Sequence, residues 1–161
     1  MGIAVRRADI GDIGEILRLL AQIAEYHHDG RPDIFKGNSR KYGADEFKAI
    51  LADGDRPVFV AADEAGKIAG YCFCMVVRYA EHAVFKDHST LYIDDFCVDA
   101  ERRRQGIGRL LFAEVKSYAE RGGIDIIDLN VWEFNEAAIK FYESLGFATQ
   151  RRRMEMKAQS L

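Results

Sequence analysis

The sequence has little that would cross-link, stiffen or export the chain. Of its 161 residues only three are cysteine and two are proline, so neither a disulfide framework nor a proline-rich linker is expected. The longest apolar runs fall far short of the roughly 20 residues that a membrane helix requires, and the N-terminus lacks the apolar core of a signal peptide. We therefore expect one cytoplasmic domain spanning residues 1–161, with no membrane partner.

An excess of positive charge is also absent. The formal net charge is -3, whereas a nucleic-acid-binding module normally presents a basic surface. Two arginine triplets, at 102–104 and 151–153, point toward nucleic acid, but no motif for stacking bases accompanies them. Hydrophobic residues make up 48% of the chain, which is enough to fill one core. We expect a globular protein with no nucleic-acid partner.

Metal ligands are scarce as well. Cys72 and Cys74 alternate in an apolar run, and on a strand they would share one face. Zinc would require two more cysteines or histidines at suitable spacing, which the sequence lacks. The adjacent His27 and His28 are awkwardly placed to share a metal ion and suit the C-terminal end of a helix, where the dipole favours a cation. We expect buried thiols and no metal site.

The apolar residues recur at spacings that alternate between helix and strand. Asp9 can cap a helix that extends to about residue 28, and Gly70 interrupts a long apolar run, where it indicates a bulge or a close backbone approach. The element order β-α-α-β-β-β-α-β-α-β indicates a mixed α/β sheet. Strands are expected at residues 3–8, 58–62, 68–77, 89–98, 126–132 and 147–156, and helices at 9–28, 44–53, 108–121 and 136–145.

The strongest chemical signal is a basic, glycine-containing loop between the strand that ends at Val98 and the helix that begins near Gly108. The first turn of a helix has unpaired N–H groups and the positive end of the dipole, and glycine lets a ligand approach the backbone, so this junction suits phosphate. A P-loop would need Gly-Lys-Ser/Thr, and a dinucleotide fingerprint would need a glycine where Leu111 stands. The alternative is an ordinary glycine-capped helix after a solvated basic turn.

A second motif lies downstream, in a strand, a turn and a helix that begins with asparagine. Taken alone, Asn135 is an ordinary N-cap and Tyr142 an ordinary helix aromatic. Taken together, the two segments resemble the GNAT superfamily of acetyl-CoA-dependent N-acetyltransferases. The loop matches the pattern Arg/Gln-x-x-Gly-x-Gly/Ala, and the helix matches Asn-x-x-Ala-x-x-x-Tyr-x-x-x-Gly-Phe. The matching residues are Arg103, Gly106 and Gly108 in the loop, and Asn135, Ala138, Tyr142, Gly146 and Phe147 in the helix.

Within that superfamily, Leu91–Val98 resembles the Leu-Glu-Asp-Phe strand of the diamine (polyamine) acetyltransferases. The resemblance implies a mixed, mostly antiparallel sheet of six to seven strands flanked by about four helices. It also implies acetyl-CoA as co-substrate, a small-molecule amine as acceptor and a homodimer. Acetyl transfer to a primary amine would proceed by direct attack through a tetrahedral intermediate.

The resemblance places the cofactor in a cleft where the strand ending at Val98 and the strand through Leu129 splay apart. The pantetheine arm would pair with the first of these strands, the pyrophosphate would lie on the amides of the basic loop, and Asn135 would contact the cofactor from the other side. The implied cofactor-binding residues are Phe96, Cys97, Val98, Arg103, Arg104, Gln105, Gly106, Ile107, Gly108, Arg109, Asn130, Asn135 and Ala138.

Two proton transfers complete the implied chemistry, because an alkylammonium must lose a proton before it attacks and the departing thiolate must gain one. Tyr142 matches the family's tyrosine acid, and Asp94 stands where the diamine enzymes have a glutamate base. Strand alternation sends Asp94 and Asp95 to opposite faces. The alternative is that Asp94 only binds the substrate's cation or forms a salt bridge. Cys97 could carry a covalent acetyl group, but the sequence offers no histidine partner for it.

The acceptor end is implied to include Tyr26, His27 and the loop at 31–35. The diamine enzymes use acidic side chains there, whereas this chain has His27 and the run at 151–153. That run either forms a solvated edge strand, whose charges prevent pairing with another chain, or supplies an arginine that binds an acidic group of the acceptor. Arginines favour a carboxylate-bearing acceptor such as an amino acid or a peptide. The remaining alternatives are acetylation of a protein N-terminus or lysine, and a non-catalytic acyl-CoA sensor.

Overall fold

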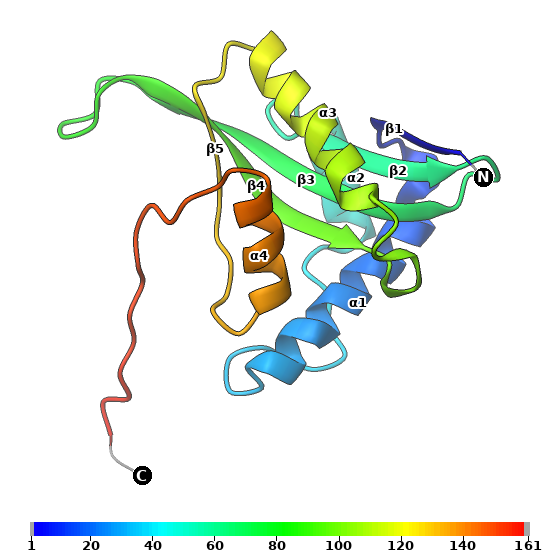
Figure 1. Ribbon diagram of the computed structural model, residues 1–161, viewed down its shortest axis with the longest axis horizontal. Coiled ribbons are helices and arrows are strands. Elements are labelled where there is room, and N and C mark those ends of the chain that lie inside the picture. The colour runs from blue at the N-terminus through cyan, green and yellow to red at the C-terminus, as the bar shows by residue number, and fades with distance from the viewer. Residues whose placement is uncertain (1, 160–161) are drawn as a thin grey trace. The chain divides into compact units, whose positions relative to one another are not determined.

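A five-stranded mixed sheet forms the centre of the computed structural model, which describes residues 2–159. The strands follow one another in space in the order of the chain (Figure 1). The first three pairings are antiparallel and the last, β4 with β5, is parallel. The strands are β1 (Ile3–Arg7), β2 (Val58–Asp63), β3 (Ile68–Tyr79), β4 (His88–Val98) and β5 (Ile126–Leu129).

The chain forms two compact units, the first reaching to Asn130 and the second beginning at Val131. The sheet and all helices but one belong to the first unit. Its helices are the 3-10 turns η1 (Ile10–Asp12) and η2 (Ala100–Arg102), and the α-helices α1 (Ile13–Gly30), α2 (Ala44–Ala52) and α3 (Ile107–Arg121). The second unit contains α4 (Glu136–Ser144).

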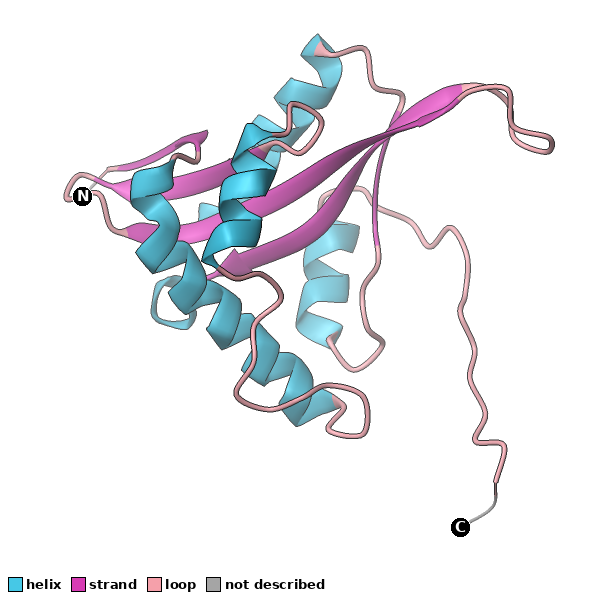
Figure 2. Cartoon of the chain, turned by 180° about the vertical axis from the view of Figure 1, so that it is seen from behind, coloured by secondary structure: helices cyan, strands magenta, loops and turns pink. Residues whose placement is uncertain are grey.

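Helices cover both faces of the sheet in the first unit. Figure 1 shows α3 in front of the strands, and Figure 2, seen from behind, shows α1 and α2 on the opposite face. The main apolar cluster joins α1 and α2 to the strands, with Leu19, Phe47 and Tyr71 among its fully buried members. On the other face, the ring of Tyr118 from α3 lies edge-on to Phe59 at 5.7 Å. None of the helices within the described residues is long and apolar enough to cross a bilayer.

Two local predictions are confirmed. Asp9 begins the first helical segment with a capping box, in which its side chain accepts from the Gly11 amide at 2.7 Å and Asp12 accepts from the Asp9 amide at 2.9 Å. Gly70 lies where the backbones approach closely, since a Cβ there would stand 2.8 Å from the carbonyl oxygen of Cys97. No larger residue fits this position without moving β4.

The second unit is organised around α4. The side chain of Asn135 accepts from the Ala138 amide at 3.2 Å, so the predicted N-cap is confirmed. The helix ends before Gly146, whose φ of 99° is the left-handed conformation that favours glycine. The rings of Tyr142 and Phe147 then pack edge-on at 5.6 Å.

The predicted final strand at 147–156 does not form, so the sheet has five strands instead of the expected six to seven. A strand is stabilised by hydrogen bonds to a neighbouring strand. The sequence of the strand itself does not show which segment, if any, is that neighbour. The prediction was wrong because the residues of a segment can favour an extended conformation without a neighbouring strand to pair with.

Candidate active site

The C-terminal half of β4 pairs with one neighbour only. The parallel pairing with β5 runs from Thr90 to Ile93 and stops opposite Leu129, whereas β4 continues to Val98 against β3. From Asp94 onward, β4 therefore has no partner strand on its second edge among the described strands. An extended ligand can add to such an edge through main-chain hydrogen bonds. The predicted pantetheine-pairing residues, Phe96, Cys97 and Val98, all lie in this half of the strand.

A left-handed turn joins β4 to α3. Arg104 and Gly106 have φ values of 65° and 79°, and Gly106 is the N-cap of α3. The first helical bond runs from the Leu110 amide to the Gly106 carbonyl at 3.1 Å, so the helix does not use the amides of Ile107 and Gly108. N–H groups at the positive end of a 15-residue helix suit an anion.

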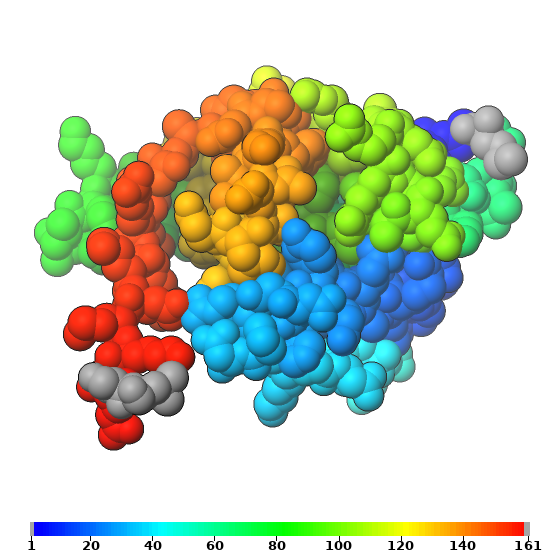
Figure 3. All heavy atoms as spheres, turned by 60° about the horizontal axis from the view of Figure 1, so that its bottom comes forward, coloured from blue at the N-terminus to red at the C-terminus, as the bar shows by residue number. Residues whose placement is uncertain are grey.

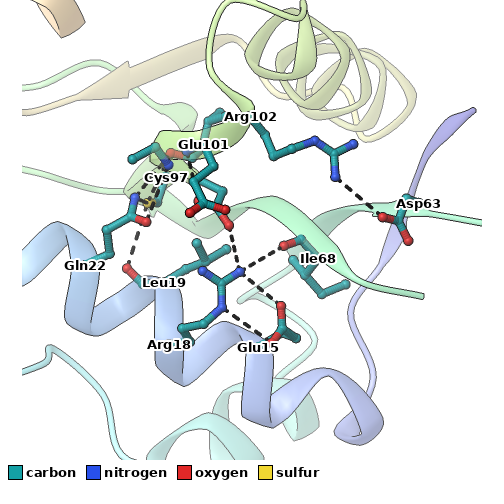
Figure 4. Close-up of polar contacts among 12 residues, drawn as sticks. Glu15, Arg18, Leu19, Gln22, Asp63, Ile68, Cys97, Glu101 and Arg102 are labelled. Atoms are coloured by element: carbon teal, nitrogen blue, oxygen red, sulfur yellow. Dashed lines mark hydrogen bonds and ion pairs between the residues drawn. The ribbon is translucent and has the colours of Figure 1, made fainter. Parts of the chain in front are cut away.

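Side chains from α1 hold the end of β4 and the turn after it in place (Figure 4). Arg18 forms an ion pair with Asp99 at 2.8 Å, and the Asp99 side chain is only 4% exposed. Gln22 donates to the Val98 carbonyl at 3.5 Å and accepts from the Ala100 amide at 3.4 Å. Burial alone would raise the pKa of Asp99, but the Glu101 amide and the Arg18 guanidinium outweigh it and hold that pKa below its usual range.

The three arginines of the loop differ in their contacts. Arg102 reaches Asp63 at 3.5 Å, and Arg103 donates to the Val98 carbonyl at 3.4 Å. Within residues 2–159, Arg104 makes neither a hydrogen bond nor an ion pair. The loop therefore keeps one cation uncommitted beside the start of α3.

The thiol of Cys97 is buried beneath α1. Its exposed fraction is 2%, and its Sγ lies 3.8 Å from the Leu19 carbonyl. Burial raises the pKa of the Cys97 thiol to about 12, so the reactive thiolate is strongly disfavoured. This environment opposes a covalent acetyl-cysteine route.

A bulge in β4 brings two carboxylates to one face of the sheet. Phe73 stands opposite Asp95 and Cys74 opposite Ile93, which leaves Asp94 as the extra residue of β4. The predicted alternation of Asp94 and Asp95 was therefore wrong. Both carboxylates bond to phenols that pack in or against the α1–α2 cluster.

Asp94 is fully engaged by the segment between α1 and α2. Lys41 bonds to its Oδ1 at 2.9 Å and to its main-chain carbonyl at 2.7 Å, while the Tyr42 hydroxyl donates to Oδ2. Arg56 in turn donates to the Tyr42 hydroxyl at 3.0 Å. Lys41 and Tyr42 were missed in the sequence, because a contact spanning 53 residues leaves no local pattern.

Asp95 has fewer charged partners than Asp94. It accepts from the Tyr71 hydroxyl at 3.2 Å. Removal from water, together with the negative charge of Asp94, raises the pKa of Asp95 to about 6, although Lys41 opposes the rise. A carboxylate with that pKa can accept a proton near neutral pH.

The predicted acceptor residues lie at the end of α1. The ring of His27 stacks on Phe35 at 5.1 Å, and His28 bonds to the Phe35 carbonyl at 2.7 Å. Burial lowers the pKa of His27, and the charge of Lys41 lowers it further. Figure 3 shows the end of α1 and the following loop as one continuous blue surface. Neither these histidines nor any other group among residues 2–159 forms a cluster that could hold a metal.

The other predicted residues fall on either side of the boundary between the units. Asn130, at the end of the first unit, donates to the Tyr92 hydroxyl of β4 at 3.0 Å. In the second unit, Asn135 caps α4, and Ala138 and Tyr142 lie on that helix. Arg18 and Gln22 of α1, by contrast, had no sequence signal that linked them to the loop.

Replacing Arg18 with methionine is expected to destabilise the protein by about 1–3 kcal/mol, because the buried Asp99 loses its charged partner. Thermal and urea unfolding measure this loss. The pKa of Asp99 is lowered in the folded state, so the difference from wild type should shrink as the pH falls through that value. Arg78→Met, which breaks an exposed pair with Asp55, is the control and should change stability far less. Equal losses in the two variants would contradict the anchoring role.

Comparisons with known proteins identify the family of the chain. Residues 20–147 match the family model described as the acetyltransferase (GNAT) family. The chain is 31% identical over 131 residues to the [ribosomal protein bS18]-alanine N-acetyltransferase of Escherichia coli K12, a match that covers 80% of this chain and 77% of that protein. It is 29% identical over 150 residues to the thialysine N-epsilon-acetyltransferase of Bos taurus, covering 89% and 83%.

A solved structure gives the same result for the fold. The crystal structure of a mutant of the BH1408 protein from Bacillus halodurans superposes with a TM-score of 0.93 and 36% identity, covering 97% of this chain and 99% of that one. With the family model spanning most of the residues, the chain belongs to the GNAT family of acetyltransferases.

Proposed function

We propose that this enzyme transfers the acetyl group of acetyl-CoA to a primary amine. The observation that carries the proposal is the continuity between the one-sided half of β4 and the turn at Gly106. A pantetheine arm is extended and rich in amides, and a pyrophosphate is anionic, so a single strand edge that leads into a helix N-terminus fits both. Acetyl-CoA supplies the thioester, and the chain supplies the groups that bind it and move protons.

The cofactor residues are proposed on the same basis. Phe96, Cys97 and Val98 offer main-chain groups along β4, and an N–H of this strand would polarise the thioester carbonyl. The loop and the first turn of α3 offer amides to the phosphates, with Arg104 as the uncommitted cation. The further residues proposed to contact the cofactor are Arg103, Gln105, Gly106, Ile107, Gly108, Arg109, Asn130, Asn135 and Ala138.

For the proton that leaves the amine, the contacts favour Asp95 over Asp94. Asp94 is already bonded to Lys41 and Tyr42, which supports the alternative in which it forms a salt bridge. Asp95 lies on the same face and is ionised at neutral pH, yet basic enough to accept a proton near pH 6. We propose Asp95 as the base, acting directly or through one water, and Asp94 as a fixed charge beside it.

Tyr142 is the proposed acid for the departing thiolate. The support is its place in the Asn-started helix motif and the packing that restrains its ring between Phe141, at 5.4 Å, and Phe147, at 5.6 Å. Attack by the amine, collapse of a tetrahedral intermediate and protonation of the thiol would then follow without an acetyl-enzyme. The raised pKa of Cys97 supports the direct route.

The family match crosses the boundary between the two units, which supports one acetyltransferase domain containing both. Three free, buried cysteines suit the reducing cytoplasm. A homodimer is proposed on the resemblance to the family alone. The bS18-alanine relative makes a protein N-terminus the second candidate acceptor.

Acetyl-CoA with a panel of amines, amino acids and peptides should release thiol, and Tyr142→Phe should reduce kcat by roughly a hundredfold because thiolate leaves unprotonated. The apparent KM for acetyl-CoA should change little. Phe141→Leu, a neighbouring ring substitution, is the control for packing. Full turnover by Tyr142→Phe would remove Tyr142 from the mechanism. Binding of acetyl-CoA without thiol release for every acceptor would favour a sensor.

Gly106→Ala is expected to weaken CoA binding by roughly tenfold, because a side chain disfavours the left-handed turn by about 1–2 kcal/mol. Calorimetric titration measures the affinity. Gly123→Ala is the matched control, since Gly123 also has a positive φ, of 62°, and open space around its Cβ position, but lies past the opposite end of α3. Both variants should lose similar stability, and only Gly106→Ala should lose affinity. A parallel loss of affinity in both would contradict the phosphate role.

The value of kcat/KM for the amine should fall as the pH drops below about 6, because Asp95 must be ionised to accept a proton. Asp95→Asn should lower kcat/KM by roughly a hundredfold or more and remove this acid limb. The conservative Asp94→Asn variant should keep the limb. If the pH profile of kcat/KM loses its acid limb in Asp94→Asn and keeps it in Asp95→Asn, the base is Asp94 and not Asp95.

A further inference from the structure

The Asp94 carboxylate, which lies near the proposed acceptor site, is already paired with a lysine of the same chain. The Lys41 ammonium makes two bonds to Asp94, and the Asp94 side chain is 12% exposed while that of Lys41 is 41% exposed. The second carboxylate oxygen receives the hydroxyl of Tyr42. Each oxygen of Asp94 therefore already has a donor from the chain itself.

The contact is held by packing as well as by charge. The Tyr42 ring lies 5.5 Å from Phe73 in the apolar cluster, and Arg56 donates to its hydroxyl at 3.0 Å. Because Lys41 precedes Tyr42 directly, fixing Tyr42 also fixes the main chain that carries the ammonium. An incoming cation would have to displace an ion pair that the fold has already assembled.

The positive charge extends around this point. The charge of Lys41 lowers the pKa values of both His27 and Asp95, so it lies near the end of α1 as well as near the proposed base. The residue before it, Arg40, lines an open pocket of about 260 Å³ with Ala21, Asn38 and Ser39. Arg40 adds a second positive charge one residue before Lys41, and the Glu25 carboxylate beside this lining accepts from the Asn38 amide at 3.2 Å.

We infer that Lys41 is a specificity-determining residue that excludes acceptors with a second ammonium and favours amines that carry a carboxylate. The inference rests on the proposed acetyl transfer and deepens it. A second ammonium on the acceptor would meet the charge of Lys41 and find Asp94 taken, whereas a carboxylate would be attracted to Lys41 and Arg40. Selection of this kind combines attraction for one ligand with repulsion of another.

Three acceptors with the same chain separate these effects. Hexamethylenediamine, hexylamine and aminocaproate present a positive, a neutral and a negative far end. The wild-type enzyme should give aminocaproate the highest kcat/KM and the diamine the lowest. Lys41→Gln, which frees Asp94 and removes the cation, should raise the ratio of diamine to aminocaproate by about tenfold, equivalent to ~1.4 kcal/mol. Most of the change should lie in the KM of the amine.

Two further variants test the cause. Lys48→Gln makes the same charge change on α2, where Lys48 pairs with Asp45 of its own helix, and it should keep the wild-type ratio. Lys41→Gln combined with Asp94→Asn should lose the gain for the diamine, because the freed carboxylate is gone. Thermal unfolding of each variant shows whether it is folded.

A wild-type preference for the diamine, or an equal change for all three acceptors in Lys41→Gln, would overturn the inference. The same three compounds are also titrated calorimetrically against the CoA complex. If acetyl transfer fails for every amine, the proposed function is wrong, and the order of the three affinities still decides the role of Lys41. An unchanged order of affinities in Lys41→Gln would reject it independently of turnover.

Discussion

The bulge at Asp94 is the constraint on which the rest of the candidate site depends. One extra residue in β4 breaks the alternation of side chains, so two adjacent carboxylates face α1 and α2 instead of being divided between the faces. Two like charges so close together are tolerated because each has its own donor, Lys41 and Tyr42 for Asp94 and Tyr71 for Asp95. Their environments differ, which separates a fixed charge from a group that can exchange a proton.

The two ends of the candidate site depend on different groups, main-chain amides at one end and side chains at the other. At the α3 end, the proposed binding of anions relies on main-chain amides and a helix dipole, and it needs little more than a left-handed turn at Gly106. At the other end, side chains from the α1–α2 segment surround Asp94, and in the proposed function their identity decides which amine is accepted. Variation in that segment could change the acceptor while the cofactor site stayed the same.

Local patterns in the sequence accounted for the features that short segments determine. The caps at Asp9 and Asn135, the close approach at Gly70 and the turn at Gly106 all follow from residue type and neighbours within a few positions. The comparisons with known proteins confirmed the family that the two motifs indicated. The roles of Asp94 and Tyr142 remain predictions.

Features that depend on distant segments could not be predicted in this way. The bulge is a mismatch between two strands and has no signature in β4 alone, so the faces of Asp94 and Asp95 were assigned wrongly. The partner of Asp94 comes from 53 residues away. The final segment at 147–156 forms no strand, and the residues within it do not show whether a neighbouring strand is present. In each case the missing information is the identity of the contacting chain segment.

The spacing of side chains along α1 has a geometric consequence for the enzyme. Arg18, Gln22 and Tyr26 follow one another at intervals of four, so they project from one side of the helix, from the anchored turn after β4 toward the acceptor end. Eight residues of helix span ~12 Å, so α1 sets the distance between the anchored turn after β4 and the proposed acceptor end. Inserting a single residue between Arg18 and Tyr26 would rotate everything beyond it by about 100° and shift it by ~1.5 Å along the axis, so the length of this stretch of α1 is as constrained as its side chains.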